Sequence, residues 1–369
     1  MKAPKNLDQK VIEEFFCPTL LASAPYSLEK EQQIEVKLDQ NENPFDWPLA
    51  IKDEVLEQLK AASWNRYPDP FAGELNALIG QHLGMPAECI LTGPGSNHQI
   101  TLLFDAIGPN LKGKMVVARP SFALFESQCQ YSNIPYETWD LNDDLEYDLK
   151  NLPSMPEGSM LVFASPNNPT GASLKREDLI KILEDNPKSL IVADEAYYEF
   201  ASEGFHDLLE KYPNLIILRT LSKTLGAAGI RIGYILSNKA IIDQLAKRRL
   251  PYLLNHFTII ASKVMLSHPD MTDFLKTHIE HVRSERERVY EKLAVWAKEK
   301  SHLLKNSEAN FLLLKCQKDQ DCNAIHEKLR LSGLMVRNIS KGPKLAGCLR
   351  ISLGTKAEND KLIQVISSL

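Results

Sequence analysis

The sequence has no long apolar run, no paired cysteines and no excess of positive charge. No apolar stretch approaches the roughly 20 residues that a membrane-spanning helix needs, and residues 1–20 lack the apolar core of a secretory signal. Lys and Arg number 43 against 48 Asp and Glu, a formal net charge of −5. Because nucleic-acid-binding domains need a basic face, we expect no nucleic-acid partner. Since no membrane-spanning run and no secretory signal is visible, we expect no membrane association and a cytoplasmic location.

The six cysteines are scattered along the chain. None forms a C-x-x-C pair, and none has a histidine at zinc-finger spacing, so we expect buried free thiols, a reducing compartment and no metal site. The 369 residues are 44% hydrophobic and 25% charged, as in ordinary globular proteins. A chain of this length is long enough for two packed domains.

Strand-like and helix-like segments alternate between residues 50 and 240. Apolar runs rich in β-branched residues predict buried strands at 114–119, 159–165, 190–196, 214–220 and 232–237. Apolar residues at helical spacing predict helices at 51–62, 99–107 and 175–185. This alternation indicates an α/β fold, with a mostly parallel sheet and helices on both faces. Such sheets bind ligands beyond the carboxyl ends of their strands.

The pattern changes after about residue 255. A long charged helix is predicted over 272–300. Short strands follow at 309–315, 334–339 and 349–354, with a helix near 322–331. This pattern predicts a smaller α+β domain. We assign residues 42–250 to the large domain, and residues 1–41 and 251–369 to the small one.

The predicted strand 214–220 leads into TLSKTLGAAGIRIGY (220–234). Lys223 lies between Ser222 and Thr224 in a glycine-rich turn, where a confined amine can form a Schiff base with an aldehyde cofactor. Arg231 occupies an otherwise apolar stretch and needs an anion, which a cofactor phosphate would supply. The alternative is a surface lysine with a structural ion-pair arginine.

The segment LIVADEAYYEF (190–200) places Asp194 at the end of another apolar strand. A buried carboxylate there needs a cation, and the protonated nitrogen of a pyridine ring is one. Tyr197 can direct its hydroxyl at an oxygen of that ring. Alternatively, Asp194 is a helix N-cap and Tyr197 is a packing residue.

Three further loops contain candidate site residues. In FASPNNPTG (163–171), Asn168 offers an amide to a planar ligand. In GPGSNHQ (93–99), Ser96 and Gln99 match a capping box that opens an apolar helix, whose first N–H groups attract phosphate. In RPSFALFE (119–126), Phe122 can stack on a pyridine ring. Taken singly, these features are equally compatible with a turn, an N-cap and a core phenylalanine.

Taken in order, the motifs resemble the fold-type I pyridoxal 5′-phosphate (PLP) enzymes, the aspartate aminotransferase superfamily, from about residue 36 to residue 358. The segments that are most similar to the histidinol-phosphate aminotransferase family are KLDQNENPF (37–45), NRYPDP (65–70), SPNNPTG, ADEAYYEF, LRTLSKTLGAAGIRIGY, ANFLLL, VRN and LRISLGT. The chain departs from that family at RRLPYLLNHF (248–257), where many relatives have PPYN, and at DWP after NENPF. Both departures concern the substrate side of the site.

The resemblance implies a PLP cofactor and a role for each matching position. It implies that Lys223 carries the cofactor, that Asp194 holds the ring nitrogen, and that Tyr197 completes the catalytic set. Asn168 would contact the ring oxygen O3′ together with Tyr197, and Phe122 would stack on the ring. The residues implied to bind the cofactor phosphate are Gly95, Ser96, Asn97, Ser222 and Arg231. Tyr67 would reach the phosphate in the neighbouring subunit, which implies a homodimer.

The resemblance also implies that Arg350 binds the substrate anion, helped by Arg337, Tyr26 and Asn41. The residue pattern agrees for Arg350, which lies on the strand face opposite Leu349 and Ile351. Two arginines near one pocket suit a phosphate monoester better than a lone carboxylate.

The expected reaction is amino transfer from histidinol phosphate to 2-oxoglutarate, which gives imidazole acetol phosphate and glutamate. The small-molecule amino donor and the 2-oxo acid are therefore the expected partners. The alternatives are an aromatic amino-acid aminotransferase, an enzyme like threonine-phosphate decarboxylase, and a PLP-binding regulatory protein without catalysis. Lys223 and Asp194 do not separate the first two, because the reaction depends on which bond at Cα is broken.

Overall fold

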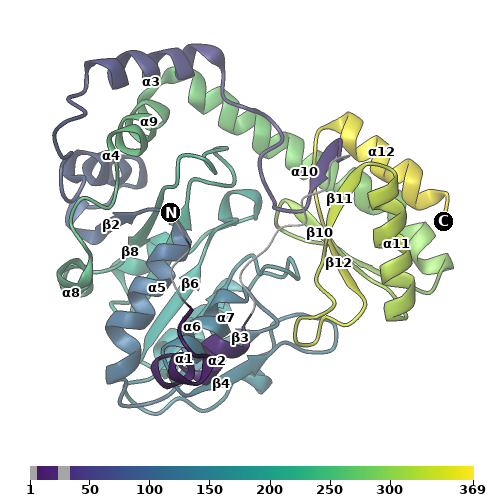
Figure 1. The fold of residues 1–369 in the computed structure, drawn as a ribbon, viewed down its shortest axis with the longest axis horizontal. Helices are drawn as coiled ribbons and strands as arrows, with labels where there is room; N and C mark the ends of the chain where they lie inside the picture. The colour runs from purple at the N-terminus through teal and green to yellow at the C-terminus, as the bar shows by residue number, and fades with distance from the viewer. Residues whose placement is uncertain (1–5, 24–33) are drawn as a thin grey trace.

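Two separate β-sheets organise the chain in the computed structural model, which describes residues 6–23 and 34–369 (Figure 1). Read across the larger, seven-stranded sheet, the strands are β2 (Ile90–Gly93), β8 (Gly233–Leu236), β7 (Leu215–Thr220), β6 (Leu190–Asp194), β5 (Met160–Ala164), β3 (Met115–Arg119) and β4 (Tyr136–Asp140). Read across the smaller, five-stranded sheet, they are β1 (Val36–Leu38), β11 (Leu334–Asn338), β12 (Cys348–Ser352), β10 (Phe311–Lys315) and β9 (Leu303–Lys305).

The larger sheet is mostly parallel, which confirms the predicted fold class. Strands β4, β3, β5, β6 and β7 run parallel, and only β8 is antiparallel to its neighbours β7 and β2. The five strands predicted in this region are β3, β5, β6, β7 and β8. The pattern missed β4, because YETWD is rich in polar residues, and β2, which is only four residues long.

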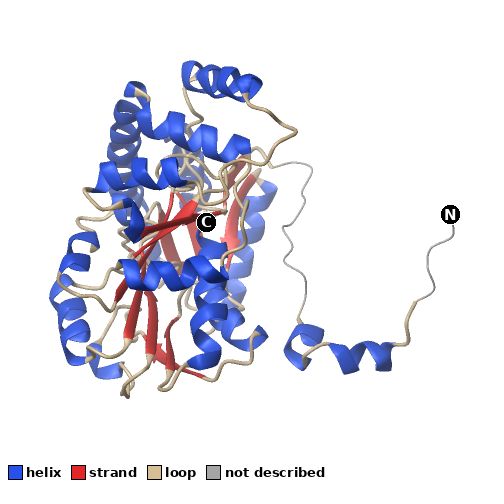
Figure 2. Ribbon diagram, turned by 90° about the vertical axis from the view of Figure 1, so that its left-hand side faces the viewer, coloured by secondary structure: helices blue, strands red, loops and turns tan. Residues whose placement is uncertain are grey.

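Helices cover both faces of this sheet, as Figure 2 shows. Successive strand residues point to opposite faces, so Ile191 and Ala193 join one core whereas Val192 joins another. The helices that share the first core are α3 (Leu49–Ala61), α4 (Gly73–Leu83), α7 (Arg176–Asp185) and α9 (His256–Ser267). The helices that share the second are α5 (Ser96–Ile107), α6 (Leu124–Tyr131) and α8 (Lys239–Arg248).

The small sheet is packed by α10 (Pro269–Glu299), α11 (Asp319–Leu331) and α12 (Lys356–Ser367) around Phe311 and Ile351. Helix α10 contributes Met271 to the core of the large sheet and Val289 to the core of the small one, so it runs from one to the other. The division of the chain at residues 41/42 and 250/251 stays a prediction.

At the N-terminal end lie the short helices α1 (Gln9–Phe15) and α2 (Pro18–Ala22), and α2 contacts α6. Over residues 6–23 and 34–369, no helix combines the length and the apolar character that a bilayer crossing requires.

A buried ion pair joins the ends of β6 and β7. Arg219 of β7 lies 2.7 Å from the carboxylate of Glu195, and both side chains are fully buried. The Tyr198 ring lies 3.6 Å below the guanidinium. Removing one partner of such a pair leaves a buried charge without compensation.

We therefore expect Glu195→Ala to lower the free energy of unfolding by about 3–5 kcal/mol, measured by urea denaturation. The matched control is Asp185→Ala, which breaks the exposed pair with Lys181 and should change stability by at most about 0.5 kcal/mol. Equal effects of the two substitutions would contradict the role of the buried pair.

Candidate active site

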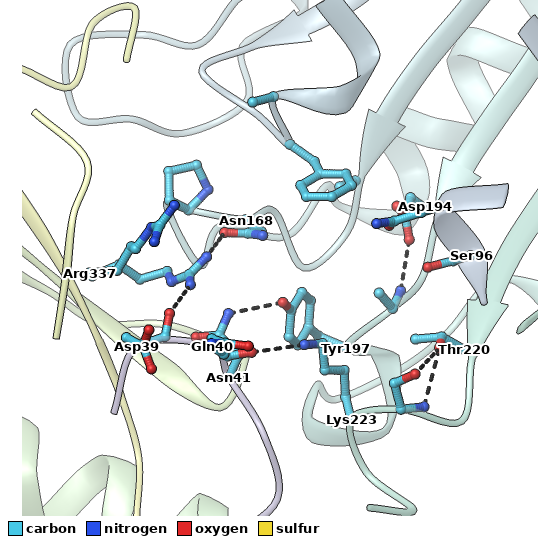
Figure 3. Close-up of a pocket in the computed structure, with 18 of the residues that line it drawn as sticks. Asp39, Gln40, Asn41, Ser96, Asn168, Asp194, Tyr197, Thr220, Lys223 and Arg337 are labelled. Atoms are coloured by element: carbon cyan, nitrogen blue, oxygen red, sulfur yellow. Dashed lines mark hydrogen bonds between the residues drawn. The ribbon is translucent and has the colours of Figure 1, made fainter. Parts of the chain in front are cut away.

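A cavity of about 730 Å³ lies between the carboxyl ends of the parallel strands and the small sheet (Figure 3). Both sheets contribute to its wall. The predicted site residues that line it are Asn41, Ser96, Asn97, Phe122, Asn168, Asp194, Tyr197, Ser222, Lys223, Arg231, Arg337 and Arg350. The structure thus brings twelve residues, predicted from scattered motifs, into one space.

Of the predicted residues that the structure describes, two do not line the cavity. Gly95 is the N-cap of α5, directly before Ser96. Tyr67 is 79% exposed, and its ring stacks on Tyr252 at a centroid distance of 4.5 Å. Tyr26 lies outside the described residues.

The topology of the sheet explains why the lining residues meet. Strands β5, β6 and β7 are parallel neighbours, so their carboxyl ends lie at one edge. Asn168 follows β5, Asp194 ends β6 and Lys223 follows β7. Phe122 follows β3 at the same edge and packs its ring edge-on against Phe125.

The Lys223 amine is held in a partly buried position. Its Nζ donates a hydrogen bond to the backbone carbonyl of Gln40 at 3.0 Å. Burial, and next the nearby charge of Arg350, lower the pKa of Lys223 to about 8. A larger share of the amine is therefore uncharged near neutral pH than in a solvated lysine, which favours nucleophilic and proton-transfer chemistry.

The turn that carries this lysine is anchored through the two residues that follow it. The Asn43 side chain donates to the Thr224 carbonyl at 3.1 Å, and the Trp47 indole donates to the Leu225 carbonyl at 2.6 Å. Thr224 in turn donates its hydroxyl to Glu199 at 2.9 Å. Lys223 is therefore presented by a fixed backbone.

Asp194 is a buried carboxylate, only 5% exposed. One of its oxygens accepts a hydrogen bond from the Ala196 N–H at 3.0 Å, but the residue that caps the following helical turn, Tyr198–Phe200, is Tyr197, so Asp194 is not a helix N-cap. Among the described residues, no cation forms an ion pair with the carboxylate, and burial raises the pKa of Asp194 to about 7. A carboxylate in this state needs a cationic ligand to stay ionised at neutral pH.

An anion cradle is built where α5 begins. The first N–H groups of a helix have no partner within it and attract anions. Gly95 has a φ of +87°, and a Cβ at this position would collide with the Arg231 guanidinium, so the arginine lies directly against the loop. The capping-box prediction is wrong. Gly95 is the N-cap instead of Ser96, and the Gln99 side chain turns back to donate to the Leu91 carbonyl at 2.6 Å.

Two arginines form the wall contributed by the small sheet. Arg337 of β11 and Arg350 of β12 are paired in register on neighbouring strands. Arg350 donates to the side-chain oxygen of Asn168 at 2.7 Å and to the Asp39 carbonyl at 2.6 Å. These bonds fix the guanidinium toward the cavity. The predicted contact of Asn168 with a cofactor oxygen stays a prediction.

Sequence reasoning missed three contributors to the site. The Gln40 carbonyl receives the lysine, Ser352 holds Asn41, and Lys341 lies on the cavity wall. A backbone carbonyl carries no side-chain signal, so Gln40 had none. The pattern LRISL did place Ser352 on the same strand face as Arg350, which is the one signal that pointed to it.

The fold and the cavity define an enzyme of the α/β class that holds a cofactor against a lysine. The family model for aminotransferases of class I and II matches residues 33–366. The chain belongs to this family, and it is a PLP-dependent aminotransferase.

The chain is also similar to individual relatives along nearly all of its length. The histidinol-phosphate aminotransferase of Chlorobaculum parvum is 33% identical over 95% of this chain and 97% of its own. The structure of a histidinol-phosphate aminotransferase from Sinorhizobium meliloti in complex with pyridoxal-5′-phosphate has a TM-score of 0.80 at 24% identity, covering 96% and 98% of the two chains. L-threonine-O-3-phosphate decarboxylase from Porphyromonas gingivalis has a TM-score of 0.76 at 22% identity, covering 90% and 98%. The two structures support the fold alone.

The cavity fits PLP on three independent counts. Asp194 is a buried acid without an ion-pair partner among the described residues, which suits a protonated pyridine nitrogen as its partner. The loop at Gly95, the start of α5 and Arg231 form a cradle for a phosphate. Lys223 offers an amine of lowered pKa in the same cavity.

Because the native carboxyl of Asp194 keeps its proton to about pH 7, whereas an unperturbed one releases it near 3.8, the native state binds more protons between these values. The stability linked to this proton is lost as pH rises from about 4 to about 7. We therefore expect Asp194→Asn to stabilise the cofactor-free protein at pH 8, by up to roughly 4 kcal/mol, with no gain near pH 4. Urea unfolding at several pH values measures this; parallel curves for the two proteins would contradict it.

Proposed function

We propose that this aminotransferase transfers the amino group of histidinol phosphate to 2-oxoglutarate, giving imidazole acetol phosphate and glutamate. The observation that carries the proposal is the in-register pair of Arg337 and Arg350 on the cavity wall. A phosphate monoester presents several anionic oxygens in one group. Two guanidinium groups therefore suit a phosphate monoester better than they suit a single carboxylate. The name of the relative from Chlorobaculum parvum, 33% identical over nearly full length, supports the same substrate.

The residues of the cavity divide the work of holding the cofactor. Bound PLP supplies an aldehyde that reacts with amines, and a protonated ring that takes up negative charge from the substrate Cα. Asp194 would keep the ring nitrogen protonated, Phe122 would cover the ring, and Tyr197 would donate to its oxygen. The residues that would hold the phosphate are Gly95, Ser96, Asn97, Ser222 and Arg231.

Lys223 would also act on the substrate directly. An amine with a pKa of about 8 can take a proton from the substrate Cα and give one back near neutral pH. Arg350 would orient the substrate by its anion, and its bonds to Asn168 and Asp39 fix the guanidinium before the substrate arrives. This division leaves the choice of substrate to the small sheet.

A panel of amino donors tests the substrate assignment. The PLP-loaded enzyme is mixed with histidinol phosphate, histidinol, phenylalanine or threonine phosphate, one donor at a time. Absorbance follows the conversion of bound PLP to its amine form, and the release of CO₂ is measured in parallel. We expect histidinol phosphate to have the highest kcat/KM of the four donors. Arg337→Gln should lower this kcat/KM by about 10–100-fold and change the kcat/KM of histidinol little, since histidinol lacks the phosphate that Arg337 would bind. Arg330→Gln, which alters the surface pair with Glu327, is the control.

Two outcomes of this panel would refute the proposal. Phenylalanine as the best donor would identify an aromatic aminotransferase. Release of CO₂ from threonine phosphate at a rate above amino transfer would identify a decarboxylase.

We further propose a homodimer in which Tyr67 reaches the cofactor phosphate of the neighbouring subunit. The exposed ring of Tyr67 stacks on Tyr252, and Trp64 and Phe71, close to Tyr67 in the sequence, are exposed as well. A monomer rarely leaves several large aromatic residues exposed together, so this surface suits a second copy of the chain.

A mixed-dimer experiment tests this arrangement. Lys223→Ala and Tyr67→Ala proteins are each expected to be nearly inactive, but a hybrid dimer has one site with an intact lysine and an intact tyrosine from the partner. Random exchange of equal amounts should therefore restore about a quarter of the wild-type activity. No restoration after exchange, shown by differently tagged subunits, would contradict a shared site.

We also propose a cytoplasmic location. Four of the six cysteines are buried as free thiols, namely Cys129, Cys316, Cys322 and Cys348. Free thiols are typical of a reducing compartment. Fractionation of cells that express the tagged protein tests this.

A further inference from the structure

A chain of three buried hydrogen bonds runs from the small sheet to Tyr197. The Asn41 backbone N–H donates to the Ser352 hydroxyl oxygen at 2.9 Å, and this hydroxyl donates to the Asn41 side-chain oxygen at 2.7 Å. The Asn41 side-chain nitrogen then donates to the Tyr197 hydroxyl oxygen at 2.9 Å. Ser352, Asn41 and Tyr197 are 2%, 1% and 5% exposed, so water does not compete for these groups.

The direction of these bonds follows from the backbone. A peptide N–H can only donate, so the Ser352 oxygen is an acceptor toward Asn41, and its own proton needs another acceptor. The Asn41 side-chain oxygen is that acceptor. With the amide reversed, the Ser352 proton would face an NH₂ group and lose its partner in a buried place, which folded proteins rarely tolerate.

This direction determines what Tyr197 can do. Because Asn41 presents its NH₂ group, the Tyr197 oxygen is the acceptor of that bond. A tyrosine hydroxyl both accepts and donates, so its proton remains available to a ligand in the cavity that Tyr197 lines. The ring itself is held edge-on by Phe311, at a centroid distance of 5.4 Å.

Asn41 cannot easily move out of this chain. Its backbone has a φ of +53°, in the left-handed region, and its carbonyl accepts a hydrogen bond from the Asn310 side chain at 3.1 Å. Figure 3 shows Asn41 beside Tyr197, with a dashed line joining the two side chains. The amide therefore serves Tyr197 with a fixed geometry.

We propose that Ser352 is a positioning residue that acts through Asn41 to direct the hydroxyl proton of Tyr197 toward the ring oxygen of the cofactor. The proposal rests on the proposed function in one respect, namely that Tyr197 contacts the cofactor. Ser352 and Arg350 share one face of β12, so the strand that binds the substrate anion also sets the donor to the cofactor.

The test is a pH titration of the absorbance of the PLP-loaded wild type, Tyr197→Phe, Ser352→Ala and the double variant. A hydroxyl that donates to the cofactor oxygen favours the form in which this oxygen is negative, so its loss raises the pKa of the bound cofactor. We expect Ser352→Ala to raise the midpoint of the spectral change by about one pH unit, and Tyr197→Phe to raise it by at least as much. In the double variant, Ser352→Ala should add nothing to Tyr197→Phe, as for two residues acting in series.

Matched variants separate positioning from general damage. Ser352→Thr keeps the hydroxyl and should retain the wild-type midpoint. Ser262→Ala removes another fully buried hydroxyl, on α9, and should leave the midpoint unchanged. Ser352→Cys keeps the volume with a weak donor and replaces Ser352→Ala if the alanine variant does not fold.

The outcomes distinguish the two levels of the proposal. An unchanged midpoint in Tyr197→Phe would refute the assigned role of Tyr197 itself. A shifted midpoint in Tyr197→Phe with none in Ser352→Ala or Ser352→Cys would overturn only the role of Ser352. A Ser352 shift that persists in the Tyr197→Phe background would also overturn it, because the effect would then bypass Tyr197.

Discussion

Three consecutive backbone carbonyls, those of Asp39, Gln40 and Asn41, hold the active site together. They accept hydrogen bonds from Arg350 at 2.6 Å, Lys223 at 3.0 Å and Asn310 at 3.1 Å. Arg350 and Asn310 belong to the small sheet and its approach, whereas Lys223 follows a strand of the large sheet. The segment after β1 therefore sets the distance between Lys223, the residue proposed to carry the cofactor, and Arg350, the residue proposed to bind the substrate anion.

The cavity walls hold their ionisable groups away from their ordinary states. Burial raises the pKa of Asp194 to about 7 and lowers the pKa of Lys223 to about 8. Neither shift helps the chain to fold, since each disfavours a charge that water would stabilise. Both suit a ligand with a cationic ring nitrogen and an aldehyde. The site is therefore organised for the cofactor-bound state. The shifted groups lower the folding stability of the cofactor-free protein, and cofactor binding restores part of it.

Much of this site could be predicted because the chemically reactive residues directly follow, or end, the apolar runs that form the strands. Lys223, Asp194 and Asn168 each follow an apolar run, and parallel strands bring their carboxyl ends to one edge. The features that escaped prediction depend on backbone groups or on distant packing. The Gln40 carbonyl has no sequence signature, and the helix start at Gly95 depends on a positive φ and on the approach of Arg231. Strand β4 was missed because its polar side chains hide the alternation that an apolar strand would show.

In the proposed assignment, the residues that bind the cofactor and the residues that bind the substrate come from different sheets. The large sheet supplies Lys223, Asp194 and the cradle at Gly95, which are proposed to hold the cofactor, whereas the small sheet supplies Arg337 and Arg350, which are proposed to bind the substrate anion. Substrate preference can then change in the small sheet without disturbing the amine or the buried acid. The Ser352–Asn41–Tyr197 chain of hydrogen bonds connects β12 of the small sheet with Tyr197, which follows β6 of the large sheet. The strand proposed to bind the substrate anion is therefore in contact with the residue proposed to bind the cofactor.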